Sequence, residues 1–286
     1  MEFLSPTGLA DALAARAARP DAVPIMGGTD VMVELNFDRH RPGALLDLTR
    51  VPDLSTWDRV DGEIRLGAGV TYTRVIDELG ADLPGLALAS RTVGSPQIRN
   101  RGTVGGNLGA ASPAGDTHPA LLAAFAEVEL TSLDGVRRLP VHEFYTGVKQ
   151  HAGRPDELIT AVWLRPATGP QQFSKIGTRN AMVIAVAAFA LALHPGTRQV
   201  GAGIGSAAPT PRRAGAAEDF LAGELDWDGR RDLAPSLVAE FGRLVTSAAS
   251  PIDDVRGTAA YRRHALAVMA ARCLTWAWTE HRGGAD

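Results

Sequence analysis

The sequence predicts an α+β protein, because three stretches with different residue patterns follow one another along the chain. Up to about residue 56 the pattern is β-α-β, and residues 57–168 combine helices with runs typical of antiparallel strands. Residues 169–286 contain strand-like runs first and helices afterwards. We therefore expect an N-terminal domain over residues 1–168, with subdomains of about 1–56 and 57–168, and a C-terminal domain over residues 169–286.

The first subdomain is expected to be a small parallel pair of strands with a crossover helix. The helix begins after Ser5-Pro6-Thr7, carries Leu9 and Leu13 on one face, and ends before Pro20. Strands are expected at residues 3–4, 22–26 and 44–48.

The second subdomain begins with an alternating strand, followed by a helix that Thr71 can cap and Gly80 can end. A further helix is expected over residues 118–125, and strands are expected at residues 63–70, 126–133, 135–144 and 157–165. These segments predict a mostly antiparallel sheet.

The C-terminal domain is expected to hold three strands and then helices. The strands lie at residues 170–177, 182–193 and 198–207, although the middle run could equally be a buried helix. Helices are expected at residues 212–223, 231–248 and 258–281. The last helix has an apolar stripe of Leu266, Met269, Cys273 and Trp276, which is typical of a core or a subunit interface.

The composition excludes several classes of protein. The 286 residues are 45% hydrophobic and 21% charged with a net charge of −3, and no stretch has the basic character that nucleic-acid binding requires. The longest apolar run is too short to cross a bilayer, and the first residues form no signal peptide. We expect a cytoplasmic protein with no membrane insertion and no nucleic-acid partner.

One cysteine, Cys273, rules out an internal disulfide and an iron–sulfur cluster held by this chain. The seven histidines form no local metal-binding pattern, and His118, like Cys273, is interpreted as structural. Redox chemistry in this protein would therefore need an organic cofactor.

Two glycine-rich segments are candidates for binding an anion. The first, Gly27-Gly28-Thr29-Asp30, follows a strand, and on its own it could also be a plain turn. The second spreads small and polar residues from Asn100 to Asp116, which predicts a long functional loop before a helix at Pro119. In this loop the amides of Thr103 to Asn107 are expected to face phosphates, while Asp116 accepts hydrogen bonds from sugar-like hydroxyls. That combination suits a nucleotide with a polyol chain.

Two other features have competing interpretations. Residues Gly203 to Ala208 match the relaxed dinucleotide fingerprint, but Pro209 and Pro211 follow at once, so we interpret them as a closely packed strand end. Lys175, on a mostly apolar strand, could pair with a carboxylate or could stabilise negative charge on a flavin.

Four motifs in this order resemble a known family. They are "PIMGGTDVMVELNF", "SPQIRNRGTVGGNLGAASPAGDTHPALLA", "FSKIGTRNAMVIAVAAFAL" and "GSAAPTPRRAGAAEDFLAG". They are similar to those of the FAD-binding medium subunits of molybdenum hydroxylases, the xanthine dehydrogenase and carbon monoxide dehydrogenase family, and most similar to bacterial xanthine dehydrogenase subunits. The resemblance covers essentially the whole chain.

The resemblance implies a vanillyl-alcohol-oxidase-type (PCMH) FAD-binding fold of two subdomains, followed by a C-terminal domain with a three-stranded antiparallel sheet and a helical bundle. The loop from Ile25 to Met32 and residues 103–107 would wrap the FAD pyrophosphate. Asp116 would bind ribityl hydroxyls, Lys175 would lie near the isoalloxazine, and Leu158 or Ile159 would line the adenine or ring pocket. The full set of residues expected to bind FAD is Ile25, Met26, Gly27, Gly28, Thr29, Asp30, Val31, Met32, Ile98, Gly102, Thr103, Gly105, Gly106, Asn107, Ser112, Asp116, Leu158, Ile159 and Lys175.

The implied function is electron transfer within a larger enzyme. A molybdenum-cofactor large subunit would hydroxylate a purine-like substrate such as xanthine or hypoxanthine, and the [2Fe–2S] clusters of a small subunit would pass electrons to FAD. NAD⁺ or another acceptor would then take them, so no catalytic residue and no metal ligand is expected in this chain. Alternatives are a related hydroxylase acting on carbon monoxide, nicotine or an aromatic substrate, a stand-alone flavin oxidoreductase, and a scaffold subunit that has lost its cofactor.

One departure from the family pattern concerns the acceptor. Many relatives carry an acidic residue shortly after the position of Arg179, and this chain has Val183 there. We expect the loss of that charge to change the flavin potential or the choice of acceptor.

Overall fold

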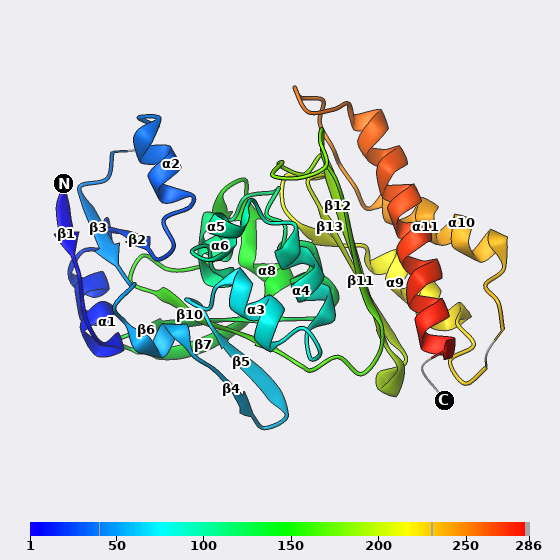
Figure 1. The fold of residues 1–286 in the computed structure, drawn as a ribbon, viewed down its shortest axis with the longest axis horizontal. Helices are drawn as coiled ribbons and strands as arrows, with labels where there is room; N and C mark the ends of the chain where they lie inside the picture. The colour runs from blue at the N-terminus through cyan, green and yellow to red at the C-terminus, as the bar shows by residue number, and fades with distance from the viewer. Residues whose placement is uncertain (40, 230, 284–286) are drawn as a thin grey trace.

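The computed structural model describes residues 1–39, 41–229 and 231–283. In Figure 1 the three larger sheets follow one another along the longest axis: a small N-terminal sheet, a central sheet with helices, and a C-terminal sheet whose outer side is covered by helices. The α+β class predicted from the sequence is confirmed.

All three strands expected in the N-terminal part join in one parallel sheet, which is larger than the expected pair. Strands β1 (Glu2–Leu4) and β2 (Val23–Ile25) both pair in parallel with β3 (Ala44–Asp47), which lies between them. Helix α1 (Leu9–Ala18) buries Ala12 and Leu13 against this sheet. A short helix absent from the prediction, α2 (Val31–Asn36), follows directly on the first glycine turn.

The central sheet is antiparallel, as expected, with strand order β4-β5-β10-β6-β7. Alternate residues on its inner strands, such as Leu66, Val128 and Val162, are fully buried beneath the helices. The strands are β4 (Trp57–Val60), β5 (Glu63–Gly67), β6 (Glu127–Ser132), β7 (Gly135–Pro140) and β10 (Leu158–Leu164).

Several helices and small elements surround this sheet. Thr71 caps α3 as expected, because its hydroxyl accepts a hydrogen bond from the amide of Arg74. The elements are η1 (Pro52–Ser55), α3 (Tyr72–Glu78), α4 (Pro84–Arg91), α7 (His118–Ala123), α8 (Val141–Phe144), β8 (Tyr145–Gly147) and β9 (Gln150–His151).

The second glycine-rich segment is not a long loop, so that prediction is wrong. It contains α5 (Pro96–Arg99) and α6 (Val104–Ala110), and Thr103 caps α6 by accepting a hydrogen bond from the Gly106 amide at 2.9 Å. Three glycines lie inside α6, and one of them, Gly105, packs against Ala68, where a Cβ would overlap with the Ala68 backbone.

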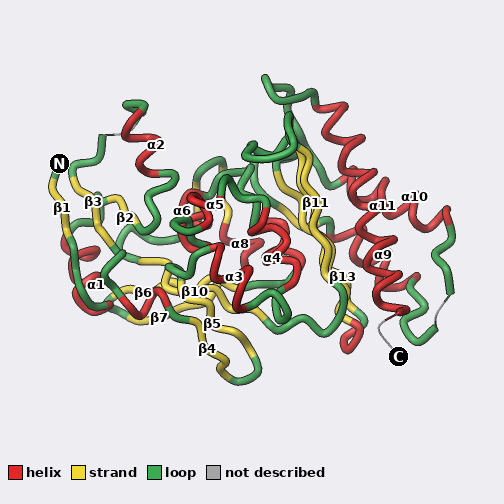
Figure 2. The backbone as a smooth tube through the Cα atoms, viewed as in Figure 1, coloured by secondary structure: helices red, strands yellow, loops and turns green. Residues whose placement is uncertain are grey.

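The C-terminal sheet is antiparallel and has four strands, visible in yellow in Figure 2. The fourth strand is the two-residue β14 (Arg212–Arg213), within the stretch predicted to begin a helix. The apolar middle run, which could have been a helix, is the strand β12. The other elements are β11 (Gln171–Ile176), β12 (Ala187–His194), η2 (Pro195–Thr197), β13 (Gln199–Gly205), α9 (Gly215–Glu224), α10 (Pro235–Ser247) and α11 (Ala259–Gly283).

Both faces of this sheet are covered, which explains the unbroken hydrophobicity of β12. Residues such as Phe189 and Leu191 pack with Phe241 and other side chains of α9–α11. The stripe predicted on α11 is buried at Leu266, Met269 and Cys273. Trp276, by contrast, is 48% exposed, because the helical repeat places Ala277, not Trp276, above Cys273.

On the opposite face of the same sheet, β12 and β13 present small residues to α4 and α7, and β11 adds Phe173. Ala188, Ala190 and Ala192 of β12 pack with alanines of α4 and α7. On β13, a Cβ at Gly201 or Gly203 would overlap with the backbone of α7, and one at Gly205 would lie 2.8 Å from a ring atom of Pro119. The interpretation of this glycine run as a closely packed strand is confirmed.

None of the helices in the described ranges is long and apolar enough to cross a membrane.

Candidate cofactor-binding site

The two glycine-rich segments are in direct contact. Gly27 packs against the backbone of Arg101 and Gly102: a Cβ at Gly27 would overlap with the Arg101 carbonyl and lie 3.0 Å from the Cα of Gly102. A side chain at position 27 would force the segments apart, so this contact explains why glycine is needed there. Segments more than 70 residues apart in the chain therefore form one site.

The first segment leaves its amides without partners. Gly28 has a φ of +74°, and α2 begins three residues later. Across the described residues, the amides of Gly27, Gly28, Thr29 and Asp30 donate no hydrogen bond to the chain. A run of unpaired amides at a glycine turn is a binding surface for an anion.

The second segment uses most of its amides internally. Val104 and Gly105 donate to the carbonyls of Val70 and Ala68, and Gly106 and Asn107 donate to Thr103. The expectation that all amides from Thr103 to Asn107 face a phosphate is therefore wrong for positions 104–107, because this segment is a capped helix. Within the described residues, the Thr103 amide and the Thr103 hydroxyl hydrogen donate to no other atom of the chain, so both can donate to a ligand.

Asp116, in the turn before α7, meets Lys175 of β11, a strand of the C-terminal sheet. The Lys175 Nζ lies 2.6 Å from Asp116 Oδ2 and also donates to the carbonyl of Thr92 at 3.1 Å. Both side chains are nearly buried, with 7% and 11% of their surfaces exposed. The other carboxylate oxygen, Asp116 Oδ1, is buried and has no hydrogen-bond partner in the described chain. A buried acceptor of this kind is costly unless a ligand or water completes it.

Burial dominates the electrostatics of Asp116. It raises the pKa of this carboxyl to about 6, and the charge and hydrogen bond of Lys175 oppose the shift. The pairing with a carboxylate, which the sequence left as one of two roles for Lys175, is present.

Tyr72 belongs to the site and was missed by the sequence interpretation. It is 3% exposed, and its ring lies against Gly102, where a Cβ would be 2.8 Å from Cε2. Burial raises its pKa, and the negative charges of Asp116 and Asp30 raise it further. No signal along the chain marks this tyrosine, because the contact joins α3 to a segment 30 residues away. The Thr92 carbonyl likewise has no sequence signature.

The remaining predicted residues lie in several different surroundings. Leu158 is buried in the core under the N-terminal sheet, and Met26 packs against the same cluster. Ile159 reaches Gly109 of α6, Ile98 packs on Gly94, and Ser112 accepts a hydrogen bond from the Ala114 amide at 3.3 Å. Val31 and Met32 begin α2, and the Met32 amide donates to the carbonyl of Gly28 at 3.1 Å.

Val183 lies close to this site. Gly177 directly follows β11 and lies two residues after Lys175. A Cβ at Gly177 would overlap with the Val183 side chain, so Val183 packs against the end of β11. The position where many relatives are expected to carry an acid therefore adjoins the strand that holds the lysine.

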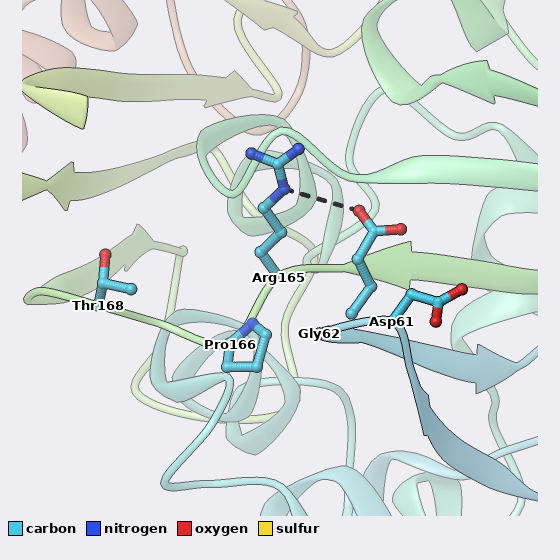
Figure 3. A pocket seen from close by; sticks show the side chains of 6 residues that line it. Asp61, Gly62, Arg165, Pro166 and Thr168 are labelled. Atoms are coloured by element: carbon cyan, nitrogen blue, oxygen red, sulfur yellow. Dashed lines mark ion pairs between the residues drawn. The ribbon is translucent and has the colours of Figure 1, made fainter. Parts of the chain in front are cut away.

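A surface hollow elsewhere does not contribute to the site. Figure 3 shows it between the β4–β5 hairpin and the segment after β10, where Arg165 Nε lies 3.6 Å from Glu63 Oε1. The Arg165 side chain is 81% exposed, and the lining includes none of the groups described above.

Two family models match this chain. A family model described as the FAD binding domain in molybdopterin dehydrogenase matches residues 1–166, and a model described as the CO dehydrogenase flavoprotein C-terminal domain matches residues 172–277.

Similar proteins include the nicotine 6-hydroxylase medium subunit of Paenarthrobacter nicotinovorans, with 29% identity over 92% of each chain. The putative xanthine dehydrogenase FAD-binding subunit XdhB of Escherichia coli is 32% identical over 73% of this chain and 75% of its own length. A solved Cu,Mo-CO dehydrogenase structure superposes with a TM-score of 0.90 and 27% identity, covering 98% of both chains.

Proposed function

Because the chain belongs to the family of FAD-binding medium subunits of the xanthine dehydrogenase and carbon monoxide dehydrogenase enzymes, we propose that it is the electron-transfer subunit of a molybdenum hydroxylase. Bound FAD supplies the exchange of electrons between one-electron and two-electron partners. The chain itself binds and orients the cofactor and excludes water from its buried end.

The residue roles follow from which groups are unpaired. The free amides of Gly27 to Asp30, with the Thr103 amide and hydroxyl, would bind the pyrophosphate. Asp116 Oδ1 would accept hydrogen bonds from ribityl hydroxyls. Lys175 would keep a positive charge at the buried end of the site, where it stabilises negative charge.

One observation supports this assignment above the others. The unpartnered Asp116 oxygen lies in the same site as a run of unpaired amides, so a ligand with both hydroxyls and phosphates would satisfy both sets. A simple phosphate ligand would meet repulsion from the carboxylate, whereas a flavin dinucleotide fits the combination.

The partners we propose are a large subunit with the molybdenum cofactor and a small subunit with [2Fe–2S] clusters. The single cysteine, Cys273, is buried in the C-terminal core, where its Sγ is hydrogen-bonded to the Ser174 hydroxyl at 3.2 Å. One buried cysteine cannot hold a cluster, so the clusters would reside on another chain. The cytoplasmic location expected from the sequence remains a prediction.

The substrate and acceptor are the finer part of the proposal. We take a purine such as xanthine as the substrate and NAD⁺ as the acceptor, which rests on the similarity to XdhB. Relatives named for nicotine and carbon monoxide provide the competing substrates, which the whole complex should be assayed against.

The test is to purify the chain together with its co-expressed partners and to record the absorption spectrum and subunit composition. We expect a yellow protein that co-purifies with iron–sulfur and molybdenum chains. Asp116→Ala should lose most of its FAD on gel filtration. A colourless wild-type protein, or a yellow chain that is active alone, would overturn the proposal.

Val183 provides the test of the acceptor. Val183→Asp restores the negative charge of the family pattern next to Gly177, at the end of the strand that holds Lys175, so we expect the ratio of NAD⁺ turnover to artificial-dye turnover to change in the assembled enzyme. An unchanged ratio would show that residue 183 has no part in acceptor choice.

A further inference from the structure

The turn that carries Asp116 rests on a buried histidine. His118 is fully buried at the start of α7, and its Nδ1 lies 2.7 Å from the hydroxyl of Tyr145, which follows α8. The two rings also meet edge to face, with centroids 4.9 Å apart. The second nitrogen, His118 Nε2, is buried and has no hydrogen-bond partner in the described chain.

That second nitrogen faces the turn. A Cβ at Gly115 would overlap with His118 Nε2 and would lie 3.0 Å from Asn107 Nδ2. Glycine is therefore needed at 115 to let the backbone pass over the imidazole ring. The residue that follows is Asp116, so the ring determines how deep the carboxylate lies.

The far side of the turn is fixed by a second contact. Asn107 on α6 accepts a hydrogen bond from the Thr117 hydroxyl at 2.6 Å. The turn from Ser112 to Thr117 is thus held between α6 on one side and the imidazole below. From this turn, the Asp116 side chain contacts Lys175 through Oδ2, while its Oδ1 has no hydrogen-bond partner in the described chain.

We propose that His118 and Tyr145 form a positioning pair that places Asp116 for the cofactor. This inference rests on the proposed function, because the group that Asp116 would receive is the ribityl chain of FAD. Neither residue touches the cofactor in this scheme: Tyr145 orients the ring, and the ring supports the turn.

The protonation states agree with such a role. Burial lowers the pKa of His118 to about 3, opposed by the neighbouring Ser112 carbonyl, so the ring is neutral. Burial also raises the pKa of Tyr145, so its hydroxyl keeps its hydrogen and can donate to Nδ1. The hydrogen of the ring is then on Nε2, beside the turn. The pair does not titrate between pH 5 and 9, and its support is constant over that range.

The test is a double-mutant cycle on the cofactor-free full chain, titrated with FAD and followed by flavin fluorescence. Tyr145→Phe keeps the ring packing and removes the hydroxyl, so we expect the Kd for FAD to rise about fivefold to tenfold. In an Asp116→Asn background the same change should alter the Kd less than about twofold, because the turn then has no carboxylate to position.

A matched control removes a buried hydrogen bond of the same length elsewhere. The hydroxyls of Thr131 and Thr160 lie 2.7 Å apart in the central sheet, and Thr131→Val should lower the melting temperature but leave the Kd for FAD unchanged. Gly115→Ala is a second route to the same readout and should weaken FAD binding by pushing the turn off the ring.

The outcomes separate the two proposals. A wild-type chain that binds no FAD defeats the proposed function. If the wild type binds FAD, then a wild-type Kd in both Tyr145→Phe and Gly115→Ala overturns the positioning role. Equal effects of Tyr145→Phe with and without Asp116 would also overturn it, since the pair would then be acting on general stability.

Discussion

Asp116 is a carboxylate whose two oxygens lie in different surroundings. One is paired with Lys175, and the other has no partner, so burial raises its pKa to about 6 despite the lysine. Such a group changes protonation near neutral pH, which carboxylates on the surface do not. The binding of any ligand that needs the ionised form must therefore depend on pH.

We expect FAD affinity to fall as the pH drops through 6. The ribityl hydroxyls donate to the ionised carboxylate, and below its pKa a proton must first be removed, which costs up to about tenfold in affinity between pH 7 and pH 5. Fluorescence titrations at several pH values measure this. Asp116→Asn should show a flat profile, and an unchanged slope in that variant would assign the pH dependence to another group.

At the scale of single residues, the residue types led to predicted roles, whereas the contacts came only from the structure. The residue type of Asp116 was enough to expect an acceptor for hydroxyls, and that role remains a prediction. The use of the amides could not be foreseen, because the partners of Val104 and Gly105 come from Val70 and Ala68, outside the motif. Tyr72 was missed for the same reason: only the folded chain brings it to Gly102.

Strand β13 is an element whose glycines are needed for contact rather than for backbone conformation. Gly201 and Gly203 lie in ordinary strand geometry and face the backbone of α7. Because α7 starts two residues after Asp116 and β13 belongs to the sheet that holds Lys175, this packing helps to determine the distance between the two charges.

Gly203→Ala should destabilise the protein by about 1–3 kcal/mol, because the added methyl group would overlap with the carbonyl of Pro119. It should also weaken FAD binding by moving α7. Urea unfolding and FAD titration measure the two effects. Gly223→Ala in α9 is the control: a Cβ there meets nothing within 4 Å, so stability should rise by about 0.5–1 kcal/mol. Equal stability of the two variants would contradict the close contact at Gly203.

Elements were predicted well where one face is polar and poorly where both are buried. The helix after Thr71 and four of the five strands of the central sheet followed from periodicity and capping, whereas β4, at the edge of that sheet, was not predicted. The run from 182 to 193 has no alternation, because both faces of β12 are covered, so strand and helix could not be told apart. Helix α6 was mistaken for a loop, since its stability comes from a cap and from packing on Ala68, not from helix propensity.

At the scale of the whole molecule, the Lys175–Asp116 ion pair connects the C-terminal sheet to the helices above the central sheet. Lys175 belongs to β11, whereas Asp116 precedes α7 and the Thr92 carbonyl follows α4. A buried pair is costly to break from one side, because the remaining charge has no counter-ion.

Lys175→Met should therefore lower the unfolding free energy of the cofactor-free protein by about 3–5 kcal/mol at pH 8. Without the lysine, the pKa of Asp116 rises further above its unfolded value. The stability of the neutral form is then kept at low pH and lost as the pH rises through the folded pKa, so the deficit should be much smaller at pH 5.

Two variants complete this measurement by denaturant unfolding at both pH values. Lys175→Met with Asp116→Asn should recover most of the loss at pH 8, because no buried charge remains. Asp228→Asn breaks the exposed pair with Arg198 and should change stability by less than about 0.5 kcal/mol. A Lys175→Met deficit of the same size at both pH values would show that packing, not charge, is responsible.

The small-residue face of the C-terminal sheet limits how this protein can change. Where a large side chain meets another, a substitution on one side can be balanced by a smaller residue on the other. At Gly201 and Gly203 the opposing atoms are backbone atoms of α7, which no substitution can shrink. Replacement of either glycine thus has no second-site suppressor among the residues it touches. A selection for suppressors should recover only reversions or distant stabilising changes.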